Sequence, residues 1–296
     1  MAEIWEVGKI LAVTEDFFSK RGIESARLDA ELLLADTLEV SREILLARRE
    51  QRLTDIELSA YRERVRHRAG NKPVAHLIGH REFYSLPFYV DKNVLIPRPE
   101  TELLVDLAAK WVNHESKIQN LKSKIQICDV GTGSGCIAAA VATHCPTACV
   151  TATEFSLAAA GIAVQNLSAL GLLDRVRVVL CDLFPLGSTE RFDVIVSNPP
   201  YLSLEEFESL PPGIRKFEPR MALTDEEDGT TIYRRLFRMA RKRLIDGGVI
   251  FVEISPRIAG RIADGSLLKD LPFTCVATHP DLAGLPRAAE LRLNPA

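Results

Sequence analysis

The sequence predicts an α/β protein in which a small helical N-terminal domain precedes a mainly parallel β-sheet covered by helices on both faces. Apolar residues recur at helical spacing over residues 1–80, and from about residue 124 short apolar runs alternate with helical segments. Strands that alternate with helices form right-handed βαβ units with parallel strands. A chain of 296 residues has room for two domains.

The first expected domain spans residues 1–78 and is helical. Apolar positions over residues 4–17 and 28–38 each follow one helix face. Thr54 with Glu57 three residues later is a capping-box pattern, which predicts a helix that runs to about residue 69. A purely structural role and recognition of a substrate are both open for this domain.

Residues 79–95 are expected to form a β-hairpin that links the domains. Residues 79–84 and 86–90 are aromatic, β-prone runs separated by turn residues. Beyond them Pro97 and Pro99 bracket Arg98, and Glu100 is expected to open a further helix.

Residues 96–296 are expected to form the α/β domain. The expected strands are 125–130, 148–154, 176–180, 192–197, 249–254, 273–278 and 288–293. The expected helices between them are 134–145, 156–170, 230–244 and a last one near 258–268. The final two strands have no helix between them, so we expect them to pair antiparallel at one edge of the sheet.

Composition and charge restrict the classes of function. Hydrophobic residues make up 47% and charged residues 26%, which is typical of a globular protein and excludes a mainly disordered chain. The net charge of -3 argues against a protein that coats nucleic acid by bulk charge, although a local basic groove stays open. The basic run 62–68 is interpreted as a solvated helix face, with a docking surface for an anionic partner as the alternative.

A cytoplasmic location is predicted. The N-terminus carries Glu3 and Glu6 and lacks the apolar region of a signal peptide, and no apolar stretch approaches the ~20 residues of a membrane helix. The six cysteines include no C-x-x-C pair, and no metal site is expected. Four of them lie in apolar runs, so we expect reduced, structural cysteines.

A glycine-rich loop follows the first strand of the α/β domain. Glycines permit a tight turn close to a ligand, and the following helix N-terminus offers free N–H donors. The loop is not the dinucleotide fingerprint G-x-G-x-x-G, because Cys136 stands where the third glycine would be. It suits a ligand with an amino-acid tail and no pyrophosphate, whereas a turn without ligand is the alternative. The candidate cofactor-binding residues are Asp129, Gly131, Thr132, Gly133, Ser134 and Gly135.

Acidic residues at the ends of the next two strands are further candidates. Glu154 can accept hydrogen bonds from both hydroxyls of a ribose. Asp182 can accept from an adenine amino group while Leu183 or Phe184 packs on the ring. An exposed strand-end acid and loop capping are the respective alternatives.

The segment Asn198-Pro199-Pro200-Tyr201 directly follows the fourth strand. Two prolines cannot continue a strand ladder, so they predict a rigid extended turn. The turn is expected to project the Asn198 side chain and the Pro199 carbonyl into the crevice at the strand ends. These acceptors suit an NH2 group on a planar system, with Tyr201 stacked on its plane. An Asn-Pro turn without ligand is the alternative, and the glycine-rich loop in the same sheet argues against it.

These motifs resemble the class I S-adenosylmethionine-dependent methyltransferases that carry N-P-P-Y, and among them the HemK/PrmC family of release factor glutamine N5-methyltransferases. The resemblance covers about residues 95–296 and includes the stretches 96–102, 218–229 and 281–287. It implies a Rossmann-like seven-stranded methyltransferase sheet behind a small helical N-terminal domain. Two departures are Glu154-Phe155-Ser156, where the family has Asp-x-Ser, and Ile254-Ser255-Pro256-Arg257 in place of a Gly/Gln-rich segment.

The resemblance implies an enzyme that transfers a methyl group from S-adenosylmethionine to the side-chain amide nitrogen of the glutamine in the Gly-Gly-Gln motif of peptide-chain release factors. Asn198, Pro199, Pro200 and Tyr201 would be catalytic, and Asn198 would also contact the cofactor. Arg98 and Glu100 either line the substrate entrance or only start a helix. We expect a monomer that binds release factors, not membranes, and forms no stable complex with nucleic acid.

Two other functions stay open. A nucleic-acid methyltransferase acting on adenine N6 or guanine N2 would present a flipped or single-stranded base amine to the same acceptors. The balanced charge of the chain argues against it. A cofactor-binding protein whose site has decayed is the second, and the intact Gly131, Gly133, Gly135, Asn198 and Tyr201 argue against that.

Overall fold

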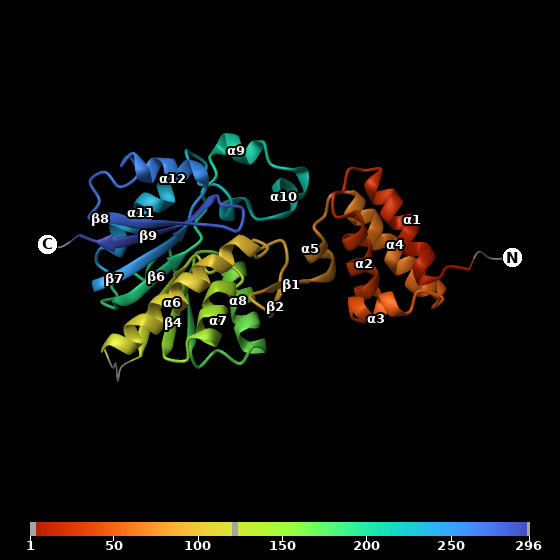
Figure 1. The fold of residues 1–296 in the computed structure, drawn as a ribbon, viewed down its shortest axis with the longest axis horizontal. Coiled ribbons are helices and arrows are strands. Elements are labelled where there is room, and N and C mark those ends of the chain that lie inside the picture. The colour runs from red at the N-terminus through yellow and green to blue at the C-terminus, as the bar shows by residue number, and fades with distance from the viewer. Residues whose placement is uncertain (1–3, 120–123, 295–296) are drawn as a thin grey trace. The chain divides into compact units, whose positions relative to one another are not determined.

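The structure is a computed structural model that describes residues 4–119 and 124–294 (Figure 1). The chain divides into two compact units. The first consists of Met1–His80 with Pro211–Phe217, and the second of Arg81–Leu210 with Glu218–Ala296. Among the described residues no helix is both long and apolar enough to cross a membrane.

The first unit is helical, as predicted. Its core gathers apolar side chains from several helices, including Phe18, Leu33 and Tyr61, which are fully buried. The capping box at Thr54 and Glu57 is confirmed, because each residue hydrogen-bonds the backbone N–H of the other. The helices are α1 (Val7–Ser19), α2 (Ala26–Thr37), α3 (Arg42–Ala47), α4 (Asp55–Ala69), α5 (Val74–Ile78) and α10 (Pro212–Phe217).

Part of the basic run on α4 is structural. Arg64 forms an ion pair with Asp36 at 2.7 Å, and Arg68 pairs with Asp29 at 2.6 Å. Both acidic partners lie on α2, so these arginines tie α4 to α2. The Asp29 side chain is 7% exposed, which reduces the screening of its ion pair by solvent. The interpretation of the run as a solvated face therefore holds only for its other members, such as the exposed Arg66.

The second unit contains the seven-stranded sheet, with strand order β5-β4-β3-β6-β7-β9-β8. The strands from β5 to β7 pair parallel, and β9 pairs antiparallel with both β7 and β8. The predicted antiparallel edge is thus confirmed. The strands are β3 (Ile125–Val130), β4 (Ala148–Glu154), β5 (Val176–Leu180), β6 (Phe192–Ser197), β7 (Leu244–Glu253), β8 (Phe273–Pro280) and β9 (Pro286–Leu293).

Helices cover both faces of this sheet (Figure 1). On one side α6 (Glu102–Gln119), α7 (Cys136–His144) and α8 (Leu157–Ala169) pack over a cluster that includes Ile127 and Val194. On the other side α11 (Thr231–Ala240) and α12 (Pro256–Ala263) pack over Cys128 and Ile195. Successive side chains of a strand point to opposite faces, so a central strand buried on both faces needs an unbroken apolar run. That requirement explains the apolar runs in the sequence.

The predicted hairpin is present as β1 (His80–Phe83) and β2 (Leu86–Tyr89). Phe83 and Phe88 are both buried in the core of the α/β unit, with their ring centroids 6.3 Å apart in an edge-on arrangement. The hairpin is therefore packed into the second unit and is more than a linker.

The structure corrects several expected boundaries. The helix after the glycine-rich loop starts at Cys136 and not at residue 134, because Gly135 adopts a left-handed conformation that ends the loop. The strand expected from residue 249 starts at Leu244 instead: β7 runs through Gly247 and Gly248, and its irregular pairing with β6 absorbs the extra residues. The last helix ends at Ala263. The short helices α9 (Leu204–Glu208) and α10 were not predicted.

Candidate active site

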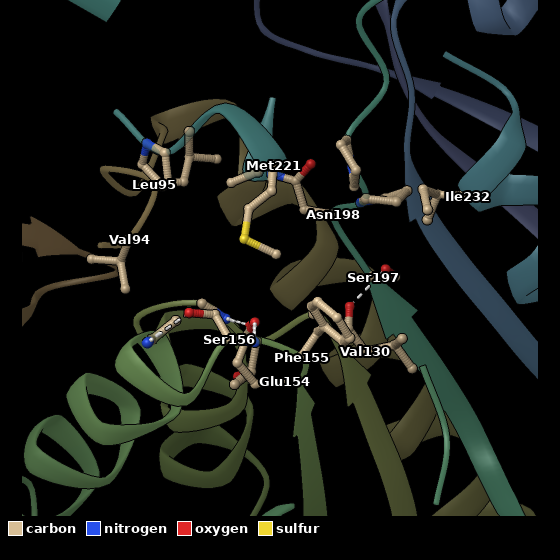
Figure 2. A pocket seen from close by; sticks show the side chains of 18 of the residues that line it. Val94, Leu95, Val130, Glu154, Phe155, Ser156, Ser197, Asn198, Met221 and Ile232 are labelled. Atoms are coloured by element: carbon tan, nitrogen blue, oxygen red, sulfur yellow. Dashed lines mark hydrogen bonds between the residues drawn. The ribbon is translucent and has the colours of Figure 1, made fainter. Parts of the chain in front are cut away.

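A cavity of about 550 Å³ lies at the carboxyl ends of β3, β4 and β6 (Figure 2). Its size suits a small organic ligand, and the carboxyl edge of a parallel sheet is where such folds bind ligands. Ten of the predicted site residues line it: Gly131, Thr132, Gly133, Ser134, Glu154, Asp182, Leu183, Asn198, Pro199 and Pro200.

The glycine-rich loop between β3 and α7 turns sharply over the end of β4. The backbone N–H groups of Gly131 and Thr132 both donate to the Thr153 carbonyl at 2.9 Å. Gly135 has φ +82, and a Cβ there would lie 3.4 Å from Ala163 on α8. The contact with Ala163 would be an ordinary van der Waals one, so glycine is favoured at this position by the left-handed backbone conformation.

Asp129 and Gly135 are not among the residues that line the cavity. Asp129 is 1% exposed and lies beneath the loop, where its Oδ2 accepts hydrogen bonds from Thr132 Oγ1 at 2.6 Å and from the Ala138 N–H at 3.1 Å. It therefore ties the loop to the first turn of α7. Burial raises the pKa of Asp129 to about 7, and its Oδ1 has no hydrogen-bond partner among the described residues.

Glu154 lies at the floor of the cavity, where the sequence predicts a ribose ligand (Figure 2). Its Oε2 accepts from the Gly133 N–H at 2.9 Å and its Oε1 from the Ser156 N–H at 2.8 Å. A carboxylate has about four lone-pair positions, so each oxygen can still accept one further hydrogen bond. Two backbone donors thus hold the carboxylate in place for a diol.

The residues after β5 are divided between the cavity and the core. Asp182 and Leu183 line the cavity, and Asp182 Oδ2 accepts a hydrogen bond from Arg235 at 2.5 Å. Phe184 is 1% exposed and packs against Phe192 in the core, so of the two alternatives predicted from the sequence only Leu183 is available to contact a base.

Asn198 lies on the cavity wall at the end of β6 (Figure 2). Its Nδ2 donates to Thr101 Oγ1 at 3.2 Å, which leaves the carbonyl oxygen Oδ1 for a ligand. The strand end is fixed by Ser197, whose hydroxyl donates to the Val130 carbonyl at 2.7 Å.

Tyr201 is not among the residues that line the cavity, and its stacking on an acceptor group stays a prediction. Its hydroxyl lies 3.4 Å from Glu253 Oε1 and donates to it, and its ring packs against the core beneath β6 and β7. Burial raises the pKa of this hydroxyl.

The wall opposite Glu154 comes from the segment between β6 and β7 and from the residues before α6. Met221 projects into the cavity, with Leu95 beside it (Figure 2). The two segments are joined by Arg98, which also lines the cavity and donates to Glu218 at 2.5 Å. Glu218 additionally accepts from the Ile96 N–H at 3.0 Å. Arg98 thus lines the site as one hypothesis predicted, whereas Glu100 is not among the lining residues and lies in the short 3-10 helix η1 (Pro99–Thr101).

Comparison with known proteins identifies the family. The PrmC N-terminal domain family matches residues 9–79, and the methyltransferase small domain family matches residues 112–209. A release factor glutamine methyltransferase of Rhodopirellula baltica is 46% identical over 257 residues, which is 86% of this chain and 86% of that protein. The chain belongs to the release factor glutamine methyltransferase family. A member from Bordetella pertussis is 38% identical and covers 94% of this chain and 98% of its own length.

Solved structures agree with the fold of this family. The hMettl16 catalytic domain in complex with the MAT2A 3′UTR hairpin 6 aligns with a TM-score of 0.55 at 17% identity, covering 78% of this chain and 82% of that chain. A methyltransferase from Pyrococcus furiosus aligns with a TM-score of 0.50 at 16% identity, covering 80% of this chain and all of that chain. The predicted seven-stranded methyltransferase sheet is confirmed.

The cavity of this family member fits S-adenosylmethionine. The paired acceptors of Glu154 suit a ribose, and the glycine-rich loop leaves space for an amino-acid tail, since a Cβ on Gly131 or Gly133 would meet nothing within 4 Å. Met221 and Leu183 offer apolar contact area for a purine. Among the described residues no group of acidic, histidine and cysteine side chains is arranged to hold a metal ion.

The departure from the family pattern at residues 254–257 has a structural explanation. Ser255 caps α12 by accepting from the Ile258 N–H, and Arg257 in the first turn of that helix donates to the Tyr201 carbonyl at 2.6 Å and to the Asp228 carbonyl at 2.7 Å. The substituted segment therefore supports the N-P-P-Y turn directly. Phe155, the other departure, is exposed and lines the cavity.

Three important residues were not singled out from the sequence. Thr101 and Glu253 lie behind Asn198, and Glu218 holds the wall opposite Glu154. Thr101 and Glu218 lie in stretches that carry the family resemblance, and Glu253 directly precedes the segment that departs from it. The sequence therefore drew attention to these regions. The individual roles were not visible, because each depends on a partner at least 97 positions away in the chain.

The buried Glu253 predicts a specific pH dependence of stability. Burial raises its pKa to about 7, although Thr101 and Arg287 oppose this shift. In the unfolded chain the pKa returns to about 4.3, so between these values the folded state keeps a proton that the unfolded state has released. This contribution to stability is fully present below about pH 4 and is lost as the pH rises through about 7.

We therefore expect the free energy of unfolding to fall less between about pH 5 and pH 8 in Glu253→Gln than in the wild type. Urea unfolding at several pH values measures both slopes. The free energy of unfolding of Asp129→Asn should likewise fall less over this pH range than that of the wild type, because burial also raises the pKa of Asp129 to about 7. Identical pH slopes for Glu253→Gln and the wild type would show that this carboxyl does not titrate in the window.

Proposed function

We propose that this protein transfers a methyl group from S-adenosylmethionine to the side-chain amide nitrogen (N5) of the glutamine in the Gly-Gly-Gln motif of peptide-chain release factors. The observation that carries the proposal is the orientation of Asn198, whose Nδ2 is bound to Thr101 and whose Oδ1 is therefore free to accept from an NH2 group. The names of the closely similar relatives support the same substrate.

In this proposal the protein acts mainly by positioning. S-adenosylmethionine, when bound, supplies an electrophilic methyl group on its sulfonium sulfur. The loop at Gly131 and Gly133 and the carboxylate of Glu154 would hold the cofactor. Asn198 Oδ1 and the Pro199 carbonyl would accept the two N–H groups of the acceptor amide and direct its nitrogen at the methyl group. Such positioning can lower a barrier by up to ~7–11 kcal/mol.

The same two acceptors address the weak nucleophilicity of an amide. Its nitrogen lone pair is delocalised into the carbonyl, so bond formation places positive charge on the nitrogen. Oxygen acceptors fixed at the two N–H groups stabilise that charge as it develops. As the carbon–nitrogen bond forms, the bond from the methyl carbon to sulfur would break and leave S-adenosylhomocysteine. The methylated, positively charged nitrogen would then release one proton to water, because only in that state is it acidic enough to do so.

Labelled S-adenosylmethionine tests the proposal. We expect label on purified release factor and none on its Gln→Ala variant in the Gly-Gly-Gln loop. Single-stranded DNA and ribosomal RNA, offered in parallel, should stay unlabelled. Label on the Gln→Ala variant would show that the methyl group is transferred to a residue other than this glutamine. Label only on nucleic acid would contradict the proposed substrate while leaving the methyltransferase assignment intact.

Three further features belong to the proposal. The helical N-terminal unit, which matches the PrmC N-terminal domain, would contribute to recognition of the release factor. A cytoplasmic location accords with a translation factor as substrate. A monomer would suffice, because the residues assigned to the cofactor and to the acceptor all lie in one unit of one chain.

A further inference from the structure

We propose that Thr101 and Glu253 are positioning residues that fix the orientation of the Asn198 side-chain amide toward the methyl acceptor. This inference rests on the proposed function, in which Asn198 Oδ1 binds the acceptor NH2 group. It assigns a task to two buried polar residues that the mechanism above does not otherwise use.

The three side chains form one hydrogen-bonded series. Asn198 Nδ2 donates to Thr101 Oγ1 at 3.2 Å, and Thr101 Oγ1 donates to Glu253 Oε2 at 2.6 Å. Thr101 is 3% and Glu253 1% exposed, so water has little access to replace either contact. Asn198 follows β6 and Glu253 ends β7; these strands pair parallel with Ser197 opposite Val252, which brings the two ends together.

The series has a direction that elementary hydrogen-bond chemistry imposes. A hydroxyl has one hydrogen and two lone pairs, whereas an ionised carboxylate can only accept. The hydrogen of Thr101 is therefore committed to Glu253, and only its lone pairs face Asn198. Nδ2 of Asn198 can donate to these lone pairs. In the flipped amide, Oδ1 would face Thr101 Oγ1 instead, and two acceptors without a hydrogen between them repel each other. The carboxylate thus selects one of the two flipped states of the amide.

This selection matters for the chemistry because the two states of Asn198 differ at the acceptor. With Nδ2 bound to Thr101, the amide offers Oδ1, which accepts from the substrate NH2 group. The flipped amide would offer an NH2 group to another NH2 group, so the substrate would lose a hydrogen bond and its alignment. Loss of alignment at a reacting centre can cost on the order of 10²-fold in rate.

Ionisation of Glu253 controls the direction of the series. The titratable or charged groups around its carboxyl are Glu100 in η1, Tyr201 after β6, Tyr233 on α11 and Arg287 on β9. Burial raises the pKa of Glu253 to about 7, while Thr101, Arg287 and Tyr201 favour the ionised form. A protonated Glu253 can donate to Thr101, whose own hydrogen is then free to turn toward Asn198, and the preference for one amide orientation is lost.

Substitutions at Thr101 separate this role from a purely structural one. Thr101→Val keeps the shape but removes the hydroxyl, and Thr101→Ser keeps the hydroxyl but removes the methyl group. In the full chain we expect Thr101→Val to lower kcat for methyl transfer to release factor by about 10–100-fold. The Kd for S-adenosylmethionine, measured by titration calorimetry, should change less than about threefold. Thr101→Ser should recover kcat to within about threefold of the wild type.

Thr143→Val is the matched control, since the hydroxyl of the exposed Thr143 on α7 likewise donates a hydrogen bond, in this case to the Ala139 carbonyl. It should leave kcat unchanged. As a second readout, kcat of the wild type should rise with pH through about 7, whereas Glu253→Gln should give a lower kcat with a flattened profile, because glutamine cannot ionise.

Three results would overturn the inference: a kcat of Thr101→Val close to that of the wild type, a Thr101→Ser variant as slow as Thr101→Val, or a loss in cofactor affinity as large as the loss in kcat. Failure of the proposed function is distinguishable. If the wild type labels only nucleic acid, the same variants are compared on that acceptor, whose base amine needs the same orientation of Asn198.

Discussion

Asn198→Ala is expected to lower kcat for glutamine methylation by about 10³-fold, the upper range for removal of one preorganised polar group. The Kd for S-adenosylmethionine should stay within a few-fold. The reason is geometric: the variant removes the acceptor Oδ1 and releases Thr101, but it leaves the glycine-rich loop and Glu154 in place. Single-turnover label transfer and titration calorimetry on the same preparation measure the two quantities.

Asn113→Ala is a suitable control for this variant, because Asn113 is an exposed residue of α6. It should transfer methyl groups at the wild-type rate. Turnover of Asn198→Ala near the wild-type rate would remove Asn198 from the mechanism. A loss of cofactor binding as large as the loss of kcat would assign Asn198 to the cofactor alone, the other role that the sequence suggested for it.

Glu154→Ala is expected to weaken S-adenosylmethionine binding by about 100-fold. Hydrogen bonds to a charged group contribute about 1.5–3 kcal/mol each. Removal of the carboxylate takes away the acceptor of two ribose hydroxyls. After allowance for the solvation of these hydroxyls by water, the binding free energy of S-adenosylmethionine should weaken by about 3 kcal/mol, which corresponds to roughly two powers of ten in Kd. The Gly133 N–H also loses its partner, so the loop itself becomes less well held.

The kinetic signature of Glu154→Ala should differ from that of Asn198→Ala. Saturating S-adenosylmethionine should restore most of kcat in Glu154→Ala, since the acceptor site at Asn198 is intact, and the effect should appear in KM. Glu82→Ala, which alters an exposed glutamate on β1, is the matched control and should leave Kd unchanged. An unchanged Kd in Glu154→Ala would place the ribose elsewhere in the cavity.

Much of the cavity was predictable because its residues follow strands directly. Gly131, Glu154 and Asn198 each follow or end an apolar run that can only be a buried strand, and parallel strands bring their carboxyl ends to one edge. Their proximity therefore follows from the apolar runs in the sequence and from the parallel pairing of the strands that these runs form. The pattern placed the backbone of Tyr201 correctly, but it could not show that the Tyr201 hydroxyl donates to Glu253, 52 positions away in the chain.

The sequence by itself determined the α/β class, the antiparallel edge of the sheet, the glycine-rich loop and the N-P-P-Y turn, because apolar periodicity and the backbone limits of glycine and proline act over a few neighbouring residues. Only the tertiary structure decided which oxygen of Asn198 faces the cavity, that Asp129 holds the loop from beneath, and that Arg257 supports the turn at Tyr201. Burial and hydrogen-bond direction depend on partners far along the chain, and these exist only once the strands have assembled.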